Sequence, residues 1–174
     1  RGLDWRVYAD GYPGDCSMVA SQGAYVKRHV PLLSFRNIQE NPTRCAKIVD
    51  AGSFGGDAAT GRLPAFTLYI PDNNHNGHDT GVAAAGRWLE ATFGPLLTSA
   101  DFMTGTLVIV TFDEGSADNN RVFTVLLGEH VASGRISRRP YTHYSLLRTI
   151  EATLGLATLG RNDASAALID DVFD

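Results

Sequence analysis

The stretch TLVIVTFDEG, from Thr106 to Gly115, contains the clearest strand signal in the chain and ends in two acidic residues. Its first seven residues are apolar or β-branched without alternation, which is typical of a strand covered on both faces. Asp113 and Glu114 follow, and the glycine after them lets the backbone turn away. In open α/β sheets, ligands bind outside the carboxyl ends of the strands. The stretch therefore predicts a buried strand that delivers paired negative charge to a metal or substrate site.

A second strand and the helix after it extend this signal to a fold class. Residues 65–70, AFTLYI, predict a strand that ends at Pro71. Residues 80–97 predict an amphipathic helix, with Asp79 or Thr80 as its cap. The order strand, polar loop, helix, strand is a βαβ unit, which implies parallel strands and a right-handed crossover. We therefore predict an α/β fold with a largely parallel sheet flanked by helices, in which residues 1–174 form a single domain.

The remaining segments give weaker signals. Residues 1–15 combine aromatic residues with turn formers and predict an irregular segment laid over the body. The other predicted segments are a helix at 17–30, a short helix at 43–49 behind the cap Asn41-Pro42, loops at 51–61 and 115–120, a strand at 121–127, a helix that Thr142 caps and Gly155 ends, and a surface wrap at 156–174.

Composition and charge exclude some classes of function. The net charge is −4 and the 15 Lys and Arg residues are scattered, so the sequence predicts no nucleic-acid partner. No apolar run is long enough to span a membrane. The chain lacks an initiator methionine and the features of a signal peptide, so we expect it to begin downstream of another segment. Cys16 and Cys45 permit one disulfide, which would suit an oxidising compartment, or else two free buried thiols.

The adjacent carboxylates Asp113 and Glu114 are the first candidate site. Successive strand residues point to opposite faces, so both carboxylates reach one ion only where the strand gives way to a turn, as Gly115 allows. Such close negative charges repel unless a cation neutralises them. A divalent metal with oxygen ligands is the simplest partner. The alternative interpretation is a pair exposed to water that caps a loop.

The polar tract DNNHNGHD, residues 72–79, is the second candidate site because it links a strand to a helix. His78 and Asp79 lie next to the predicted helix N-terminus, where an imidazole can donate to a phosphate oxygen or protonate a leaving group. His75 could act with them, and His143 in the first turn of the last helix could line the same edge. The alternatives are an Asx-rich turn at residues 72–79 and a His143 that packs the helix entry.

Several stretches together resemble one family, the phosphoesterases that include secreted acid phosphatases and bacterial-type phospholipases C, within the alkaline phosphatase-like superfamily. The similar stretches are FTLYIPDNNHNGHDTGVAAAGRWLEATFGPLL, GTLVIVTFDEG, NNRVFTVLLGEHV and YTHYSLLRTIEATLGLATLGRND. The stretches LDWRVYADGYPGDC and NPTRCAKIV look like the fungal acid phosphatase branch. The resemblance implies that the chain is part of a three-layer alkaline phosphatase-like domain. It also implies a secreted protein.

The resemblance assigns roles to residues and shows what the chain lacks. It implies that Asp113 and Glu114 bind one divalent metal ion and that His78 contacts the phosphoryl group of a phosphate ester. Asn76 stands where the family more often has aspartate, so no role is assigned to it. Family members carry a Glu-Asn metal motif and a Ser or Thr nucleophile upstream of the whole stretch that this chain resembles, so the resemblance implies that both lie outside this chain. The chain therefore resembles the C-terminal half of the catalytic domain, with an N-terminal chain or segment as its partner.

The sequence leads to three functional hypotheses. The first is hydrolysis of phosphate monoesters by the intact enzyme through a phospho-enzyme. In this hypothesis the chain supplies only part of the active site and is inactive by itself. The second is a phospholipase C-type phosphodiesterase. The third is a fragment that binds a metal or a partner chain without turnover.

Overall fold

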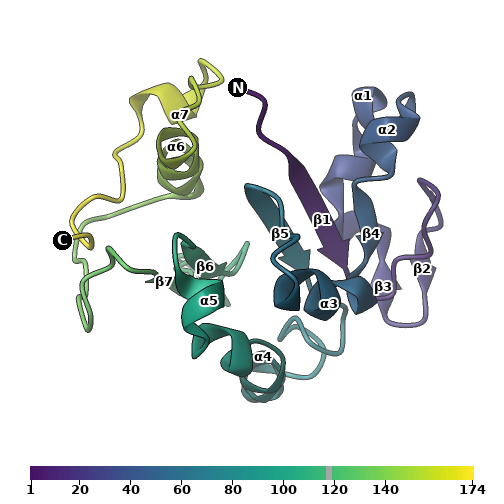
Figure 1. The fold of residues 1–174 in the computed structure, drawn as a ribbon, viewed down its shortest axis with the longest axis horizontal. Coiled ribbons are helices and arrows are strands. Elements are labelled where there is room, and N and C mark those ends of the chain that lie inside the picture. Colours follow the sequence, from purple (N-terminus) through teal and green to yellow (C-terminus); the bar gives the residue numbers. More distant parts are fainter. Residues whose placement is uncertain (117–118) are drawn as a thin grey trace. The chain divides into compact units, whose positions relative to one another are not determined.

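The chain folds into two compact units in a computed structural model that describes residues 1–116 and 119–174 (Figure 1). The N-terminal unit comprises Gly2–Phe102, and the C-terminal unit comprises Met103–Asp174 together with Arg1. The loop predicted at 115–120 is described only in part, because positions 117 and 118 lie outside the described residues. That residues 1–174 act as a single domain stays a prediction.

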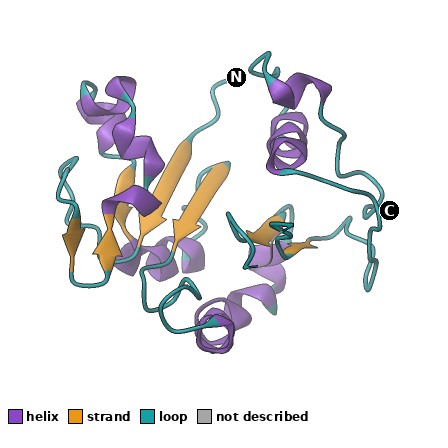
Figure 2. Ribbon diagram, turned by 180° about the vertical axis from the view of Figure 1, so that it is seen from behind, coloured by secondary structure: helices purple, strands orange, loops and turns teal. Residues whose placement is uncertain are grey.

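The N-terminal unit is built on a parallel sheet of three strands in the order β4-β1-β5 (Figure 2). These strands are β1 (Trp5–Ala9), β4 (Ile48–Asp50) and β5 (Phe66–Ile70). Val7 in the middle of β1 lies opposite Ile48 on one side and Leu68 on the other. The predicted α/β class with a parallel sheet is confirmed. The irregular segment predicted at 1–15 is wrong, because Trp5–Ala9 forms the central strand and the turn formers begin only after it.

Side chains alternate across β1 and build a core on each face of the sheet. Val7 and Ala9 belong to one core cluster, which includes Leu33 and Ile38 from two short helices between β1 and β4. Tyr8 points to the opposite face, where Ala51 and Phe54 complete the second cluster. Partly buried Phe93 and Leu96 of α4 (Val82–Leu97) pack against this second cluster. Helices thus cover both faces of the sheet, which makes the N-terminal unit three layers deep.

The segment between β1 and β4 corrects two predictions. Instead of a helix at 17–30, the chain forms a hairpin of β2 (Ser21–Gln22) and β3 (Tyr25–Val26), because Gly23 adopts a φ of 58° in the two-residue turn. The following elements are η1 (Lys27–His29), η2 (Pro31–Ser34), α1 (Arg36–Gln39) and α2 (Pro42–Cys45). The predicted cap is confirmed, since the Asn41 side chain accepts from the Arg44 amide, but α2 ends at Cys45 and not at 49.

Residues 51–61 form helices where a loop was predicted. They contain η3 (Ala51–Ser53) and α3 (Phe54–Ala59), which run through three of the glycines that suggested a loop. Phe54 anchors this segment edge-on to the rings of Tyr8 and Tyr69, with ring centroids 5.2 Å and 5.1 Å apart. Tertiary packing therefore overrides the low helix propensity of glycine here.

The long helix α4 confirms the amphipathic prediction, although its cap is Gly81 and not Asp79 or Thr80. The short helix α5 (Ala100–Met103) follows at the boundary between the two units. Within the part of the chain that the structure describes, no helix combines the length and the apolar character needed to cross a membrane.

In the described part of the C-terminal unit, a two-stranded antiparallel sheet is accompanied by two helices. Both predicted strands are present, as β6 (Val108–Thr111) and β7 (Thr124–Leu127), and they pair antiparallel. The residues of β6 are half-buried or exposed, in place of the full burial expected. Parallel pairing of β6 with β5 would join the two units and stays a prediction.

The last helix, α6 (His143–Thr153), begins where the sequence predicted it. A capping box fixes its start, because the Thr142 and Ser145 side chains each bond to the other's backbone amide. After α7 (Asn162–Ser165), the tail packs into the unit and is not only a surface wrap, since Ile169 and Val172 are buried.

Candidate functional site

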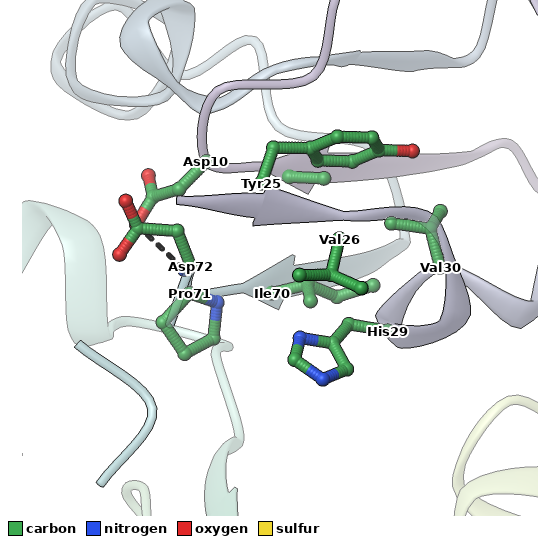
Figure 3. A pocket seen from close by; sticks show the side chains of 9 residues that line it. Asp10, Tyr25, Val26, His29, Val30, Ile70, Pro71 and Asp72 are labelled. Carbon is green, nitrogen blue, oxygen red and sulfur yellow. Dashed lines mark hydrogen bonds between the residues drawn. The ribbon is translucent and has the colours of Figure 1, made fainter. Parts of the chain in front are cut away.

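Acidic residues follow the carboxyl ends of the three parallel strands in the N-terminal unit. Asp10 comes directly after β1, Asp50 is the last residue of β4, and Asp72 lies two residues beyond β5. The Asp50 carboxylate caps the following turn by accepting from the Gly52 amide at 2.9 Å. Asp10 and Asp72 lie side by side at one end of a shallow pocket between β1, β3 and β5 (Figure 3). Parallel strands thus concentrate negative charge at the edge where α/β sheets bind ligands.

Asp10 is held in place by Tyr69, a residue of the neighbouring strand. The Tyr69 hydroxyl donates to Asp10 Oδ1 at 2.7 Å. Burial raises the pKa of Tyr69 well above its usual range, and the negative charge of Asp10 raises it further. Tyr69 therefore stays a hydrogen-bond donor at ordinary pH and fixes one oxygen of Asp10. The other oxygen, Oδ2, accepts a weak bond from the Asp72 amide at 3.4 Å.

His75 completes this group. The Asp72 carbonyl accepts from the His75 amide at 3.0 Å, and Asp72 Oδ1 accepts from the Asn74 amide at 2.9 Å, so a tight turn orients both residues. The His75 ring stacks on Trp88 of α4, with centroids 5.0 Å apart and planes inclined by 12°. Its Nδ1 lies 2.9 Å from Asp72 Oδ1 and 3.4 Å from Asp10 Oδ2. We call Asp10, Asp72 and His75 the carboxylate–histidine triad.

The triad could hold a metal ion, because one donor atom from each residue lies within 4.8 Å of the other two. Sequence reasoning proposed His75 as a catalytic residue and did not assign Asp10 or Asp72. Asp10 was missed because residues 1–15 were interpreted as irregular. The signal that could have found it is the run WRVYA before Asp10, which has the composition of a strand.

His78 and Asp79 form a separate pair in the same tract. His78 Nδ1 lies 2.6 Å from Asp79 Oδ1, and both side chains are largely exposed, at 71% and 52%. The Asn76 side chain accepts from the His78 amide at 2.9 Å and shapes the turn. Since an ionised carboxylate only accepts, Nδ1 carries the proton of this bond, which leaves Nε2 of His78 facing solvent.

In the C-terminal unit, His143 contacts the backbone of the predicted metal ligands. His143 Nε2 lies 2.8 Å from the Asp113 carbonyl oxygen, which can only accept, so Nε2 is the donor. The side chains of Asp113 and Glu114 are exposed, and neither forms an ion pair among the described residues. A side chain at Gly115 would overlap the Arg121 backbone, so the turn after β6 requires glycine.

The structure thus brings the predicted site residues together in three groups. His143 contacts the Asp113 backbone in the C-terminal unit, with Glu114 next to Asp113 in the chain; His78 meets Asp79; and the remaining histidine, His75, joins two carboxylates that were not predicted. That His78 and Asp113 contribute to one site would require the two units to meet, and it stays a prediction.

Comparison with known proteins assigns the chain to a family. A model of the phosphoesterase family matches residues 1–157. The chain belongs to the phosphoesterase family. This confirms the resemblance to the phosphoesterases that was drawn from the sequence motifs. The roles of residues 72–79 and of the Asp113-Glu114 pair, which lie within the matched range, stay predictions.

Among individual proteins, fungal acid phosphatases are similar to this chain over most or all of its length. A probable acid phosphatase of Kluyveromyces lactis is 35% identical over 99% of this chain and 44% of the fungal protein. A phosphate-repressible acid phosphatase of Penicillium chrysogenum is 33% identical over 100% of this chain and 45% of that protein. A phosphatidylinositol-3-phosphatase of Mycobacterium tuberculosis is 29% identical over 91% of this chain and 51% of that protein. The chain therefore spans about half the length of these relatives.

Proposed function

We propose that this phosphoesterase chain is part of a metal-dependent acid phosphatase that hydrolyses phosphate monoesters through a covalent phospho-enzyme. The observation that carries the proposal is the His78–Asp79 pair, because a carboxylate fixes the imidazole while its other nitrogen stays open to solvent. Family membership and the names of the relatives supply the substrate class.

His78 would act on the phosphoryl group or the leaving oxygen. A protonated imidazole can donate its Nε2 hydrogen to the oxygen that departs, and the Asp79 carboxylate stabilises the positive charge. Removal of Asp79 would leave His78 free to rotate and would weaken this stabilisation. Asp79 is thus a positioning residue in the proposal.

Asp113 and Glu114 suit a hard or borderline divalent metal ion, because they offer exposed carboxylate oxygens without an ion pair among the described residues. Such an ion would polarise the nucleophile and a phosphoryl oxygen. His143 fixes the Asp113 backbone through the 2.8 Å contact and so orients the turn that presents both carboxylates.

The nucleophile would come from outside this chain. The chain covers 44% and 45% of the two fungal relatives, which leaves more than half of each protein unmatched. We therefore propose that an N-terminal segment supplies a Ser or Thr nucleophile and the remaining metal ligands. The Cys16–Cys45 disulfide supports an oxidising, extracellular setting.

The test is hydrolysis of p-nitrophenyl phosphate by this chain alone and by the chain joined to the upstream segment, each with added divalent metals. We expect turnover only with the upstream segment. In the active protein, His78→Ala should lower kcat by roughly 100-fold or more, as loss of a general acid does. Asp113→Asn should abolish the increase in phosphatase activity on addition of divalent metal. His130→Ala, at another exposed histidine, is the matched control.

Three results would contradict the proposal. Turnover that Asp113→Asn leaves unchanged would remove Asp113 from the metal site. Stable folding and metal binding without turnover, even when the upstream segment is present, would favour a non-catalytic binding module. Preferred cleavage of a phosphodiester over a monoester would favour the phospholipase C-type alternative.

A further inference from the structure

We propose that Asp10, Asp72 and His75 form a second cation site, which binds a divalent first-row transition metal ion within the N-terminal unit. This site is additional to the one proposed at Asp113 and Glu114. Its metal binding does not depend on phosphatase activity.

The distances between the donor atoms fit a common metal ion. A ligand atom lies about 2.0–2.2 Å from a bound zinc-like ion, so neighbouring ligand atoms stand roughly 3.0–3.5 Å apart. His75 Nδ1 lies 2.9 Å from Asp72 Oδ1 and 3.4 Å from Asp10 Oδ2. The two distances from His75 therefore match the spacing that a metal ion would impose on adjacent ligands, and all three donor atoms lie within 4.8 Å of one another.

His75 Nδ1 also lacks a partner that its position demands. The atom is buried, yet it makes no hydrogen bond of acceptable geometry among the described residues, although two carboxylates lie within reach. A buried polar atom without a partner is costly. A cation between Nδ1 and the two oxygens would give Nδ1 its missing partner and would balance the negative charge of the two carboxylates.

Surrounding contacts hold the three ligands in place. Tyr69 donates to Asp10 Oδ1 and leaves Oδ2 on the His75 side, while the Asn74 amide donates to Asp72. Stacking on Trp88 fixes the His75 ring without using either nitrogen. Such outer contacts orient ligands and are features of built metal sites.

The donor set indicates the class of ion. Imidazole favours zinc, iron, cobalt or nickel over calcium and magnesium, and carboxylates supply the charge balance. Three protein ligands leave at least one coordination position for water or another ligand. The side chains of the triad are 14% to 37% exposed, so solvent can reach the open coordination position.

The stacking of His75 on Trp88 provides a direct readout. The chain contains two tryptophans, so Trp5→Phe leaves Trp88 as the only tryptophan signal. Titration with Co²⁺, a paramagnetic ion, should quench Trp88 fluorescence to a plateau. Equilibrium dialysis of Co²⁺ against the unmodified chain gives the stoichiometry without any substitution.

Variants locate the ion. His75→Phe keeps an aromatic ring against Trp88 but removes the nitrogen, and Asp72→Asn removes a negative charge. Each substitution should weaken the Co²⁺ affinity measured by quenching by roughly 10-fold or more. Tyr69→Phe should weaken the Co²⁺ affinity as well, since Asp10 loses the hydrogen bond that orients its carboxylate. His130→Gln is the control for a surface imidazole and should leave the titration unchanged.

The outcomes separate the two proposed sites. Quenching that survives Asp113→Asn with Glu114→Gln, but not Asp72→Asn, supports the second site whatever the phosphatase assay shows. Equal quenching by Co²⁺ in His75→Phe, in Asp72→Asn and in the protein without these substitutions would overturn the proposed second site. So would the absence of saturable Co²⁺ binding in the unmodified chain, which would make the triad an ion pair between imidazolium and carboxylates.

Discussion

At the scale of single residues, carboxylates decide most of the chemistry that this chain can perform. Each of the three histidines proposed for catalysis contacts an acidic residue: His75 and His78 through carboxylates, and His143 through the Asp113 carbonyl. The sequence identified these histidines by their position after a strand or at a helix start. It could not assign their partners, because Asp72, three residues from His75, and Asp10, 65 residues from it, look equally plausible in a linear chain.

Asp57 shows how a carboxylate can serve stability alone. It accepts from the Tyr8 hydroxyl at 2.7 Å and forms ion pairs with Arg6 at 2.9 Å and Arg62 at 3.2 Å. The Tyr8 hydrogen bond and these arginines hold the pKa of Asp57 below its usual value. The ionised form therefore stabilises the folded state at neutral pH.

We predict that Asp57→Asn flattens the acid limb of the stability curve. A carboxylate whose folded pKa lies below the unfolded value, about 3.9, contributes fully above that value and loses its contribution as the pH falls through the folded pKa. The unfolding free energy of the wild type should therefore fall more steeply than that of Asp57→Asn below about pH 4. Urea unfolding at several pH values measures both curves.

Asp101→Asn, at an exposed aspartate of the same unit, is the matched control for the loss of one negative charge. An Asp57→Asn curve that runs parallel to the wild type at acid pH would contradict the role of Asp57.

At the scale of elements, the sequence predicted those whose periodicity is strong and local. The helices α4 and α6 and the strands β5, β6 and β7 are present. Long amphipathic helices and uninterrupted apolar strands keep their signal within one segment. The hairpin at 21–26 and helix α3 were missed, because glycine-rich segments adopt helix or strand when tertiary contacts such as those of Phe54 stabilise them.

We predict that Thr142→Ala destabilises the C-terminal unit by about 1 kcal/mol, the usual cost of losing an N-cap. The substitution removes one half of the capping box with Ser145 and exposes the helix start that carries His143. Thermal unfolding followed by circular dichroism measures the loss. Thr153→Ala, at the exposed opposite end of α6, should change stability by less than half as much. Equal effects would mean that the capping box contributes nothing.

At the scale of the whole molecule, the disulfide links segments that the sheet alone does not join. Cys16 and Cys45 are 29 residues apart, with Cα atoms 5.6 Å from each other. The sequence left disulfide and free thiols open, and the fold brings the two residues together. The loop that holds Cys16 is thereby tied to the end of α2.

We predict that reduction of the disulfide lowers the unfolding free energy of the chain by roughly 3–4 kcal/mol. This is the loop-closure entropy expected for a cross-link between residues with this separation in sequence. Urea unfolding with and without reductant measures it. Cys16→Ser with Cys45→Ser should reproduce the reduced protein and should not respond to reductant. Intact-mass measurement should show a gain of two hydrogen atoms on reduction. Two titratable thiols in the untreated protein would contradict the disulfide.

The sequence by itself determined the α/β class, the principal helices and strands, and the phosphoesterase resemblance that places Asp113, Glu114 and His78 as candidates. These features are local, because periodicity and short motifs lie within one continuous segment. Only the tertiary structure decided that Trp5–Ala9 is the central strand and that Asp10, Asp72 and His75 form a triad. Such a triad arises when parallel strands distant in sequence end at one edge, and register and strand order are set by packing across the sheet, which no single segment encodes.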